Sequence, residues 1–244
     1  MGISFCGLYF RALRKDMLLN NNNDFKHIIT VNGQFIEVAY KDKRVFELIN
    51  NNWSTIDGQI IFKLANKKKS AIKIEKISGS DFIFETCNYC SKTNRSVFLL
   101  GGKEASNILS VKLLKTKYGI KISGYSPPYM SYPFSKDVAQ SIKNKIVEFK
   151  PDYVFVAFGM PKQEFWIDDN KEFLKNNNIR FAIGCGGTFE FVSGNLKRAP
   201  YWIQKAGIEW LFRFIQEPKR LWKRYLIGNL KCLIIYLKKE LLLI

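Results

Sequence analysis

Residues 153–188 read YVFVAFGMPKQEFWIDDNKEFLKNNNIRFAIGCGGT, and this order of apolar and polar residues decides the fold class. Residues 153–158 are a continuous apolar run of strand length, and residues 164–176 have helical spacing. Residues 180–183 are a second expected strand, apolar after Arg180, and a glycine-rich turn follows it. A buried strand, a helix and another buried strand in succession predict two parallel strands joined by a crossover helix.

The same alternation extends towards both ends of the chain. Strands are expected at 28–32, 53–58, 96–100 and 120–124, and helices at 35–50, 105–118 and 135–149. Strands that alternate with helices predict an α/β fold of Rossmann-like type, with a mostly parallel sheet covered by helices on both faces. After residue 194 the pattern is helical only, so we expect an α/β domain over 1–194 and a helical appendage over 195–244.

The charge of the chain points to an anionic partner. The net charge is +18 over 244 residues. Residues 195–244 hold eleven Lys or Arg residues against three Glu residues, so a fifth of the chain carries nearly half of the excess. Nucleic acid, a phosphorylated substrate and an acidic membrane surface all attract such a protein.

The five cysteines indicate reduced thiols rather than a disulfide framework, because their number is odd and their spacing irregular. Cys87 and Cys90 have CxxC spacing, but no second ligand pair follows and His27 is the single histidine. We therefore expect no metal site and no cofactor. No signal peptide and no membrane-spanning run are expected either.

The appendage has an amphipathic pattern. Apolar residues recur at three- and four-residue steps with lysines between them: Leu226, Leu230, Leu233, Ile234, Leu237 and Leu241. A helix packed on the core would show the same spacing. The basic surplus and the aromatic residues, which include Trp210 and Trp222, favour a helix that lies on a membrane surface.

Five loops are expected to meet at one edge of the sheet, because the carboxyl ends of parallel strands lie together. They contain residues 30–32, 57–58, 101–102, 159–163 and 184–188. Asp57 is the candidate general base, although an Asp-Gly step often forms only an Asx-turn. Thr30 and Asn32 end the first strand, where either side chain can contact a ligand or satisfy loop backbone groups.

Two further loops hold candidates for phosphate recognition. Gln163 is a candidate catalytic residue: it opens a helix whose backbone amides suit a diphosphate, and its side-chain amide suits sugar or phosphate recognition. Lys162 adds a cation there, and Glu164 is expected to cap the helix start. Glycines at the other strand ends are candidates for close contact with a substrate or for tight turns alone. These glycines are Gly101, Gly102, Gly184, Gly186 and Gly187.

The C-terminal third carries longer motifs. Residues 159–164 and the glycine turn are followed by Arg198-Ala199-Pro200, by a helix with Glu209-Trp210 and Arg213, and by residues 217–225, which read EPKRLWKRY. In this order the motifs resemble the WecG/TagA/CpsF family of bacterial glycosyltransferases, glycosyltransferase family 26. The resemblance covers about residues 30–230.

The resemblance implies an inverting, metal-independent transfer of a sugar from a UDP-sugar to a polyprenyl-diphosphate-linked sugar. In the best-known branches, which make surface polysaccharides and teichoic-acid linkage units, the sugar is N-acetylmannosamine or its uronic acid and the acceptor is undecaprenyl-diphosphate-N-acetylglucosamine. For this chain the resemblance therefore implies N-acetylmannosamine or a related hexose derivative. The family's catalytic base corresponds to Asp57, and its threonine near the sugar corresponds to Thr30. The resemblance also implies a cytoplasmic protein, peripheral on the inner face of the cell membrane.

Without a metal, protein cations must stabilise the leaving diphosphate. The appendage offers four arginines for this role: Arg198, Arg213, Arg220 and Arg224. Two other functions stay open, a non-catalytic scaffold of polysaccharide assembly and, with less support from the fold pattern, a nucleic-acid-binding protein. A homo-oligomer is also open, because an apolar helix face can pack against a second subunit.

Overall fold

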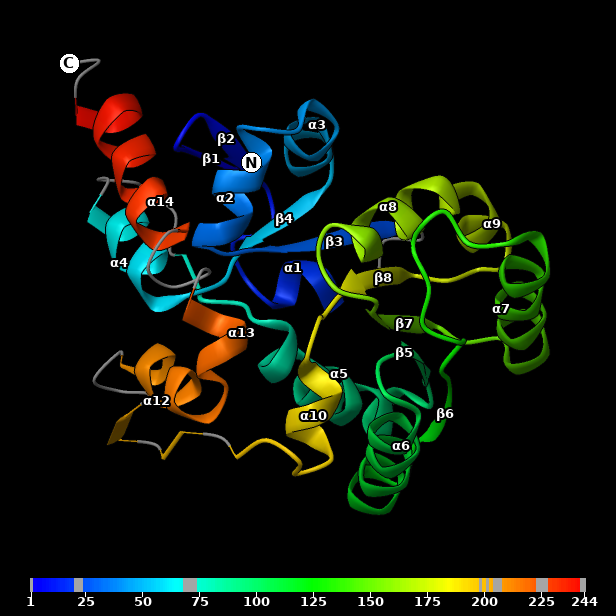
Figure 1. Cartoon of the computed structure of the whole chain (residues 1–244). Coiled ribbons are helices and arrows are strands. Elements are labelled where there is room, and N and C mark those ends of the chain that lie inside the picture. Colours follow the sequence, from blue (N-terminus) through cyan, green and yellow to red (C-terminus); the bar gives the residue numbers. More distant parts are fainter. Residues whose placement is uncertain are drawn as a thin grey trace. The chain divides into compact units, whose positions relative to one another are not determined.

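The computed structural model describes residues 2–19, 24–67, 74–197, 199–200, 202–203, 208–222 and 228–241. Six strands form one sheet in the spatial order β4-β3-β8-β7-β5-β6, and the pairings that join the last five are parallel. The strands are β3 (Lys26–Val31), β4 (Trp53–Ile56), β5 (Ser96–Gly101), β6 (Lys121–Tyr125), β7 (Tyr153–Ala157) and β8 (Phe181–Gly184). The predicted α/β fold is confirmed (Figure 1).

The chain divides into two compact units. The first, here the terminal unit, comprises Met1–Arg14, Val31–Ile77 and Leu196–Ile244, and the second, the sheet unit, comprises Lys15–Thr30 and Ser78–Asn195. One division falls between Asn195 and Leu196, next to the expected boundary after residue 194. The segment Leu196–Ile244 groups with the N-terminal hairpin and with residues 31–77 in the terminal unit.

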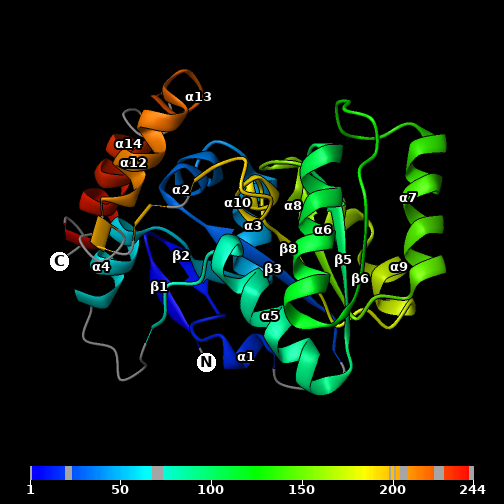
Figure 2. The same cartoon turned by 90° about the horizontal axis from the view of Figure 1, so that it is seen from below.

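Two layers of helices cover the strands of the sheet unit. On one face lie α7 (Lys136–Phe149), α8 (Lys162–Asp169) and α9 (Lys171–Asn176), and on the other lie α5 (Gly79–Thr93), α6 (Glu104–Tyr118) and α10 (Thr188–Val192) (Figures 1 and 2). β7 is buried at every residue, which is why its sequence is a continuous apolar run rather than an alternating one. Trp166 and Ile167 of α8 pack with Val154 and Val156 in the core of the first face.

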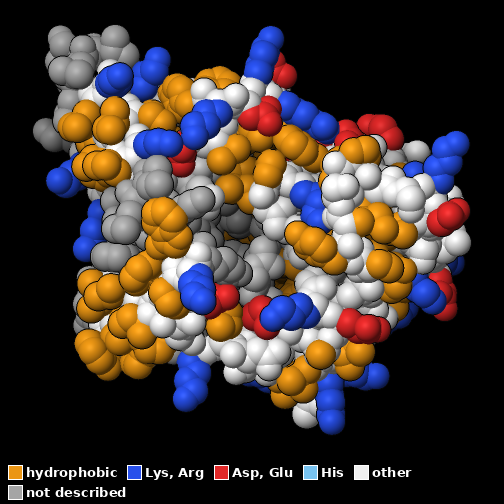
Figure 3. Space-filling model, in the orientation of Figure 1, with side chains coloured by type: hydrophobic (Ala, Val, Ile, Leu, Met, Phe, Trp, Pro, Cys, Tyr) orange, Lys and Arg blue, Asp and Glu red, His pale blue; other side chains and the backbone are white. Residues whose placement is uncertain are grey.

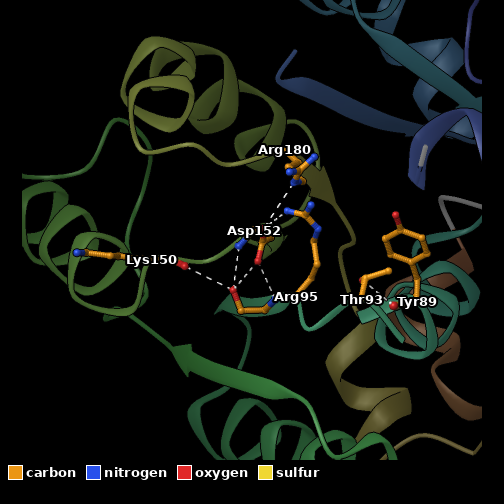
Figure 4. A network of polar contacts seen from close by, with 7 residues as sticks. Tyr89, Thr93, Arg95, Lys150, Asp152 and Arg180 are labelled. Atoms are coloured by element: carbon orange, nitrogen blue, oxygen red, sulfur yellow. Dashed lines mark hydrogen bonds and ion pairs between the residues drawn. The ribbon is translucent and has the colours of Figure 1, made fainter. Parts of the chain in front are cut away.

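A polar network ties the strands of the sheet unit together at their amino ends (Figure 4). Asp152, just before β7, accepts a hydrogen bond from Arg95 Nη1 at 2.6 Å. It also accepts from the backbone and hydroxyl of Ser96, at 2.9 and 3.0 Å, and Arg180 Nε lies 3.5 Å away. Burial alone would raise the pKa of Asp152, but the bonds from Arg95 and Ser96 outweigh it and lower that pKa.

Some element boundaries differ from the sequence expectation. The single helix expected over 35–50 is two helices, α2 (Gly33–Ala39) and α3 (Lys43–Asn51), because Asp42 caps the second one by accepting from the backbone N–H groups of Arg44 and Val45. The helix α5 and the antiparallel hairpin β1 (Ile3–Phe5) and β2 (Leu8–Phe10) were not predicted.

The terminal unit holds the C-terminal helices α12 (Glu209–Gln216), α13 (Pro218–Trp222), α14 (Asn229–Tyr236) and the π-helix η2 (Leu237–Leu241), together with α4 (Gln59–Lys67). Lys231 Nζ donates to Glu37 Oε1 of α2 at 2.9 Å. Glu240 Oε1 accepts from the backbone N–H of Cys6 at 2.7 Å, and Tyr236 lies against Phe5. These contacts fix α14 and η2 on the N-terminal elements of the same unit.

The five cysteines are buried and none of them forms a disulfide. Cys87 and Cys90 lie on α5, where burial raises the pKa of both thiols, that of Cys90 to about 12. Thiols that stay protonated at neutral pH are poor nucleophiles and poor metal ligands.

Candidate functional site

The carboxyl ends of the strands in the sheet unit lie level with one another. Gly184 pairs in register with Val156 of β7 on one side and with Ile29 of β3 on the other, and Ala157 pairs with Gly101 of β5. The loops that follow β3, β8, β7 and β5 therefore leave the sheet at one edge. In open α/β sheets this edge is where ligands bind.

Thr30 lies at this edge and holds the end of the neighbouring strand. Its Oγ1 donates to the backbone carbonyl of Gly184 at 3.1 Å. Of the two roles left open for this residue, the structure shows the satisfaction of a loop backbone group. The hydroxyl oxygen keeps its acceptor capacity.

Gln163 connects the loops after β7 and β8. Its side chain is buried, and its Oε1 accepts from the backbone N–H groups of Gly159 at 3.2 Å and Gly186 at 3.1 Å. Its Nε2 donates to Glu164 Oε1 at 2.7 Å. The amide is thus engaged within the protein, at the place where we expected it to face sugar or phosphate.

Glu164 has a different position from the one expected. The start of α8 shows no side-chain cap hydrogen bond, and Glu164 is instead buried, with 1% of its surface exposed. Burial raises the pKa of its carboxyl to about 7, against the opposing effect of the bond from Gln163. Sequence reasoning missed this residue, because an acidic residue in a first helical turn is typical of a cap.

Lys162 points its ammonium group at the loop that follows β6. Its Nζ donates to the carbonyl of Met130 at 2.9 Å and lies 4.9, 5.7 and 5.8 Å from the ring centroids of Tyr129, Phe134 and Phe158. Burial lowers the pKa of Lys162. A lysine surrounded by aromatic rings in this way anchors a loop through cation–π contacts.

The glycines at this edge have different surroundings. A Cβ on Gly184 would lie 2.6 Å from Gln163 Nε2 and closer still to Glu164 Oε1, so the buried pair requires glycine there. Gly101 and Gly102 have φ of +87° and +73°, and a Cβ on either would meet a phenylalanine ring. At Gly186 and Gly187 no atom of the described residues lies within 4 Å of that position. Within the described part of the chain there is therefore room for a ligand beside these two glycines.

The remaining candidates belong to the terminal unit. Asp57 follows β4, and its backbone N–H donates to the carbonyl of Val31 at 2.8 Å. Asn32 is the N-cap of α2, where its Oδ1 accepts from the N–H of Phe35 at 3.1 Å. For Asn32 the structure thus shows the backbone role that was left open.

The proposed arginines are only partly covered by the structure. Arg198 and Arg224 lie outside the described residues, and so do the side chains of Arg213, on α12, and Arg220, on α13.

Possible metal sites and membrane spans concern only the described residues. No group of three or more His, Cys, Asp or Glu side chains in the described ranges is arranged to hold a metal ion. Among the helices that the structure describes, none is long and apolar enough to cross a bilayer.

Comparison with known proteins identifies relatives over most of the chain. The model of the glycosyl transferase WecG/TagA/CpsF family matches residues 2–243. An N-acetylglucosaminyldiphosphoundecaprenol N-acetyl-beta-D-mannosaminyltransferase of Bacillus subtilis (strain 168) is 32% identical over 82% of this chain and 74% of its own. A protein of the same name from Staphylococcus aureus (strain MRSA252) is 28% identical over 92% of this chain and 83% of its own. This chain belongs to the WecG/TagA/CpsF family of glycosyl transferases.

Proposed function

We propose that this protein transfers N-acetylmannosamine from a UDP-sugar to undecaprenyl-diphosphate-linked N-acetylglucosamine, in the synthesis of a surface polysaccharide or a teichoic-acid linkage unit. The observation that carries the proposal is the family match over residues 2–243, together with relatives named for this transfer. The level strand ends of the sheet unit, with room among the described residues beside Gly186 and Gly187, support a nucleotide-sugar site at that edge.

Asp57 is the proposed general base. Its carboxylate takes the proton from the acceptor hydroxyl, whose oxygen attacks the anomeric carbon on the face opposite UDP. The bond from that carbon to the diphosphate oxygen breaks, and UDP leaves with its electron pair. One displacement of this kind inverts the anomeric centre.

The leaving diphosphate gains negative charge, and its stabilisation dominates the barrier. We assign this task to the backbone N–H of Gly187 in the turn after β8 and to arginines of the C-terminal segment, of which Arg213 and Arg220 lie on described helices. Thr30 and Gln163 support the site by holding Gly184, Gly159 and Gly186 in place. On this proposal the reaction needs no metal.

The C-terminal helices are proposed to dock on the lipid surface that carries the acceptor. Ile215 of α12 is 70% exposed and Leu230 of α14 is 59% exposed, and Trp222, Leu233 and Leu237 are exposed as well. Figure 3 shows hydrophobic side chains gathered over α14 and over α12, with Lys and Arg side chains around them. Exposed apolar side chains among cations suit the boundary between acyl chains and anionic headgroups.

The transfer is tested by UDP release from a panel of UDP-sugars, with a short-chain polyprenyl-diphosphate-N-acetylglucosamine acceptor and with EDTA present. We expect acceptor-dependent release with one donor, and loss of at least about a hundredfold in Asp57→Asn, as for removal of a general base. A folded Asp57→Asn protein that keeps full activity would remove Asp57 from the mechanism. Release that EDTA abolishes would overturn the metal-independent part.

Membrane docking is tested separately by flotation with vesicles of anionic or zwitterionic lipid. We expect the wild type to float with anionic vesicles and Ile215→Glu/Leu230→Glu to stay behind. Val147→Glu, a matched change at an exposed apolar residue of the sheet unit, should float like the wild type. If the double variant still floats, or if it only changes the oligomeric state, these helices are not the lipid contact.

A further inference from the structure

Glu164 is a buried carboxyl group with no role in the reaction proposed above. One of its oxygens, Oε1, accepts from Gln163 Nε2. The other, Oε2, is buried and has no hydrogen-bond partner among the described residues. Burying a carboxyl group in this state costs free energy, because the lost hydration is only half replaced. Such a cost at a candidate site calls for a functional reason.

The reason lies in the orientation of the Gln163 side chain. A side-chain amide has an oxygen that accepts and a nitrogen that donates. The N–H groups of Gly159 and Gly186 both point at this amide, so only its oxygen can serve them. The nitrogen must then face the other side, where Glu164 Oε1 accepts from it. If the amide turned over, its nitrogen, a donor, would face the N–H groups of Gly159 and Gly186, which are donors too. Both hydrogen bonds would then be lost.

Gly159 and Gly186 belong to the loops after two neighbouring strands, β7 and β8. One oxygen therefore sets the spacing between these loops, and Gly184 makes room for the pair because a side chain there would collide with both Gln163 and Glu164. The strand order runs outward from this point in opposite directions, to β3 and β4 on one side and to β5 and β6 on the other. This is the place where open α/β sheets bind nucleotides.

We propose that Glu164 is a positioning residue for the donor site: it fixes the orientation of the Gln163 amide, and Gln163 thereby holds the Gly159 and Gly186 loops at the spacing that the UDP-sugar requires. The inference rests on the proposed function for the identity of the ligand. The arrangement of the loops does not depend on that identity, and it can be measured without a ligand.

Two variants of the full-length protein separate this role from simple core packing. Glu164→Gln keeps an acceptor oxygen for Gln163, whereas Glu164→Leu fills a similar volume without one. Hydrogen exchange is measured on peptides that contain Gly159 and Gly186, since exchange reports local opening. UDP affinity and the donor KM and kcat follow on the same samples, with thermal unfolding as the check on folding.

We expect faster exchange at both loops in Glu164→Leu and wild-type exchange in Glu164→Gln. Because the two loops are no longer held at a fixed spacing in Glu164→Leu, UDP affinity should fall about tenfold or more in that variant. The donor KM should rise accordingly, and Glu164→Gln should restore both within about threefold. The melting temperature should change little, because Leu removes the buried unpaired oxygen as well as the acceptor.

Unchanged exchange at both loops in a folded Glu164→Leu protein would overturn the inference, whatever its effect on activity. Equal damage by Glu164→Gln and Glu164→Leu would also overturn it, because the conservative variant keeps the acceptor. If the wild type binds no UDP, the proposed donor is wrong, while the exchange measurement still decides whether Glu164 positions the loops.

Discussion

The strands of the sheet unit are connected in opposite ways at their two ends, which form the amino edge and the carboxyl edge of the sheet. At the amino edge Asp152 accepts from Arg95 and Ser96 and pairs with Arg180, so a single carboxylate connects the starts of β5, β7 and β8. At the carboxyl edge the connection between β7 and β8 passes through a neutral amide, with a half-satisfied carboxyl group behind it. We expect the fully paired charge to stabilise the folded state. The half-satisfied arrangement is tolerated where it serves binding.

The largest effect on stability is expected from Asp152→Ala. It leaves Arg95 and Arg180 close together without their carboxylate and removes the acceptor for Ser96. We expect a loss of about 2–4 kcal/mol in the free energy of unfolding, because breaking a partly buried charged network leaves uncompensated charge. Urea titration measures it. The specific activity of the folded fraction should be unchanged, and a stability loss below about 1 kcal/mol would contradict the difference between the edges.

At the carboxyl edge Gly184→Ala is expected to affect both stability and activity. The new methyl group collides with Gln163 and Glu164, and overpacking of this kind costs about 1–3 kcal/mol. Gly187→Ala is the matched control, because no atom of the described residues lies within 4 Å of its Cβ position. Its stability should stay within about 0.5 kcal/mol of the wild type, while its donor KM should rise because the diphosphate is proposed to contact this backbone. Equal stability of the two variants would contradict the packing at Gly184.

The difference between the edges also separates what the sequence could predict from what it could not. The apolar run of β7 and the glycine turn after β8 were enough to place the strands and the loops, because burial on both faces leaves a direct pattern in the sequence. The helix α5 was missed because its apolar residues are interrupted by Asp81, Glu85 and Asn88 at helical positions. Hydrophobic spacing is a weak signal for such a helix.

Side-chain direction could not be read from the sequence at all. Gln163 and Glu164 are polar neighbours at a helix start, a place where solvent exposure or capping is usual. Burial of both depends on a glycine twenty residues later, Gly184, whose missing side chain leaves the space. The C-terminal segment is a similar case, because its amphipathic spacing shows an apolar face but not that Lys231 and Glu240 contact α2 and the N-terminal hairpin.

His27 gives a third test, based on pH. Both ring nitrogens are buried without a hydrogen-bond partner in the described part of the chain, and burial, with a smaller effect of Lys171, lowers the pKa of His27 from 6.5 to about 3. Between these two pH values the unfolded chain binds more protons, so stability is full above 6.5 and is lost as pH falls. One such group changes the free energy of unfolding by at most about 1.4 kcal/mol per pH unit.

The measurement is urea unfolding at pH 7, 6 and 5 for the wild type and for His27→Leu. We expect the variant to lose less stability on acidification. Glu164 titrates in the opposite sense between 4.5 and about 7, but it is present in both proteins and cancels in the difference. Parallel pH curves for the two proteins would show that His27 does not stay neutral in the folded state.

The smallest effect is expected from Lys162→Met, which compares an anchoring role with a phosphate-binding one. The ammonium contacts the Met130 carbonyl and three aromatic rings, and a partly exposed contact of this kind contributes about 0.5–1 kcal/mol. Methionine keeps the apolar stem beside those rings.

If Lys162 only anchors the loop after β6, the donor KM should change less than about threefold. Loss of a direct ammonium–phosphate bond of about 1.5–3 kcal/mol should instead raise the donor KM more than tenfold. We expect the smaller change, because burial lowers the pKa of this lysine and its ammonium is already held by the loop. A rise above tenfold, with unchanged kcat and unchanged unfolding, would show that Lys162 leaves the aromatic rings to bind the donor.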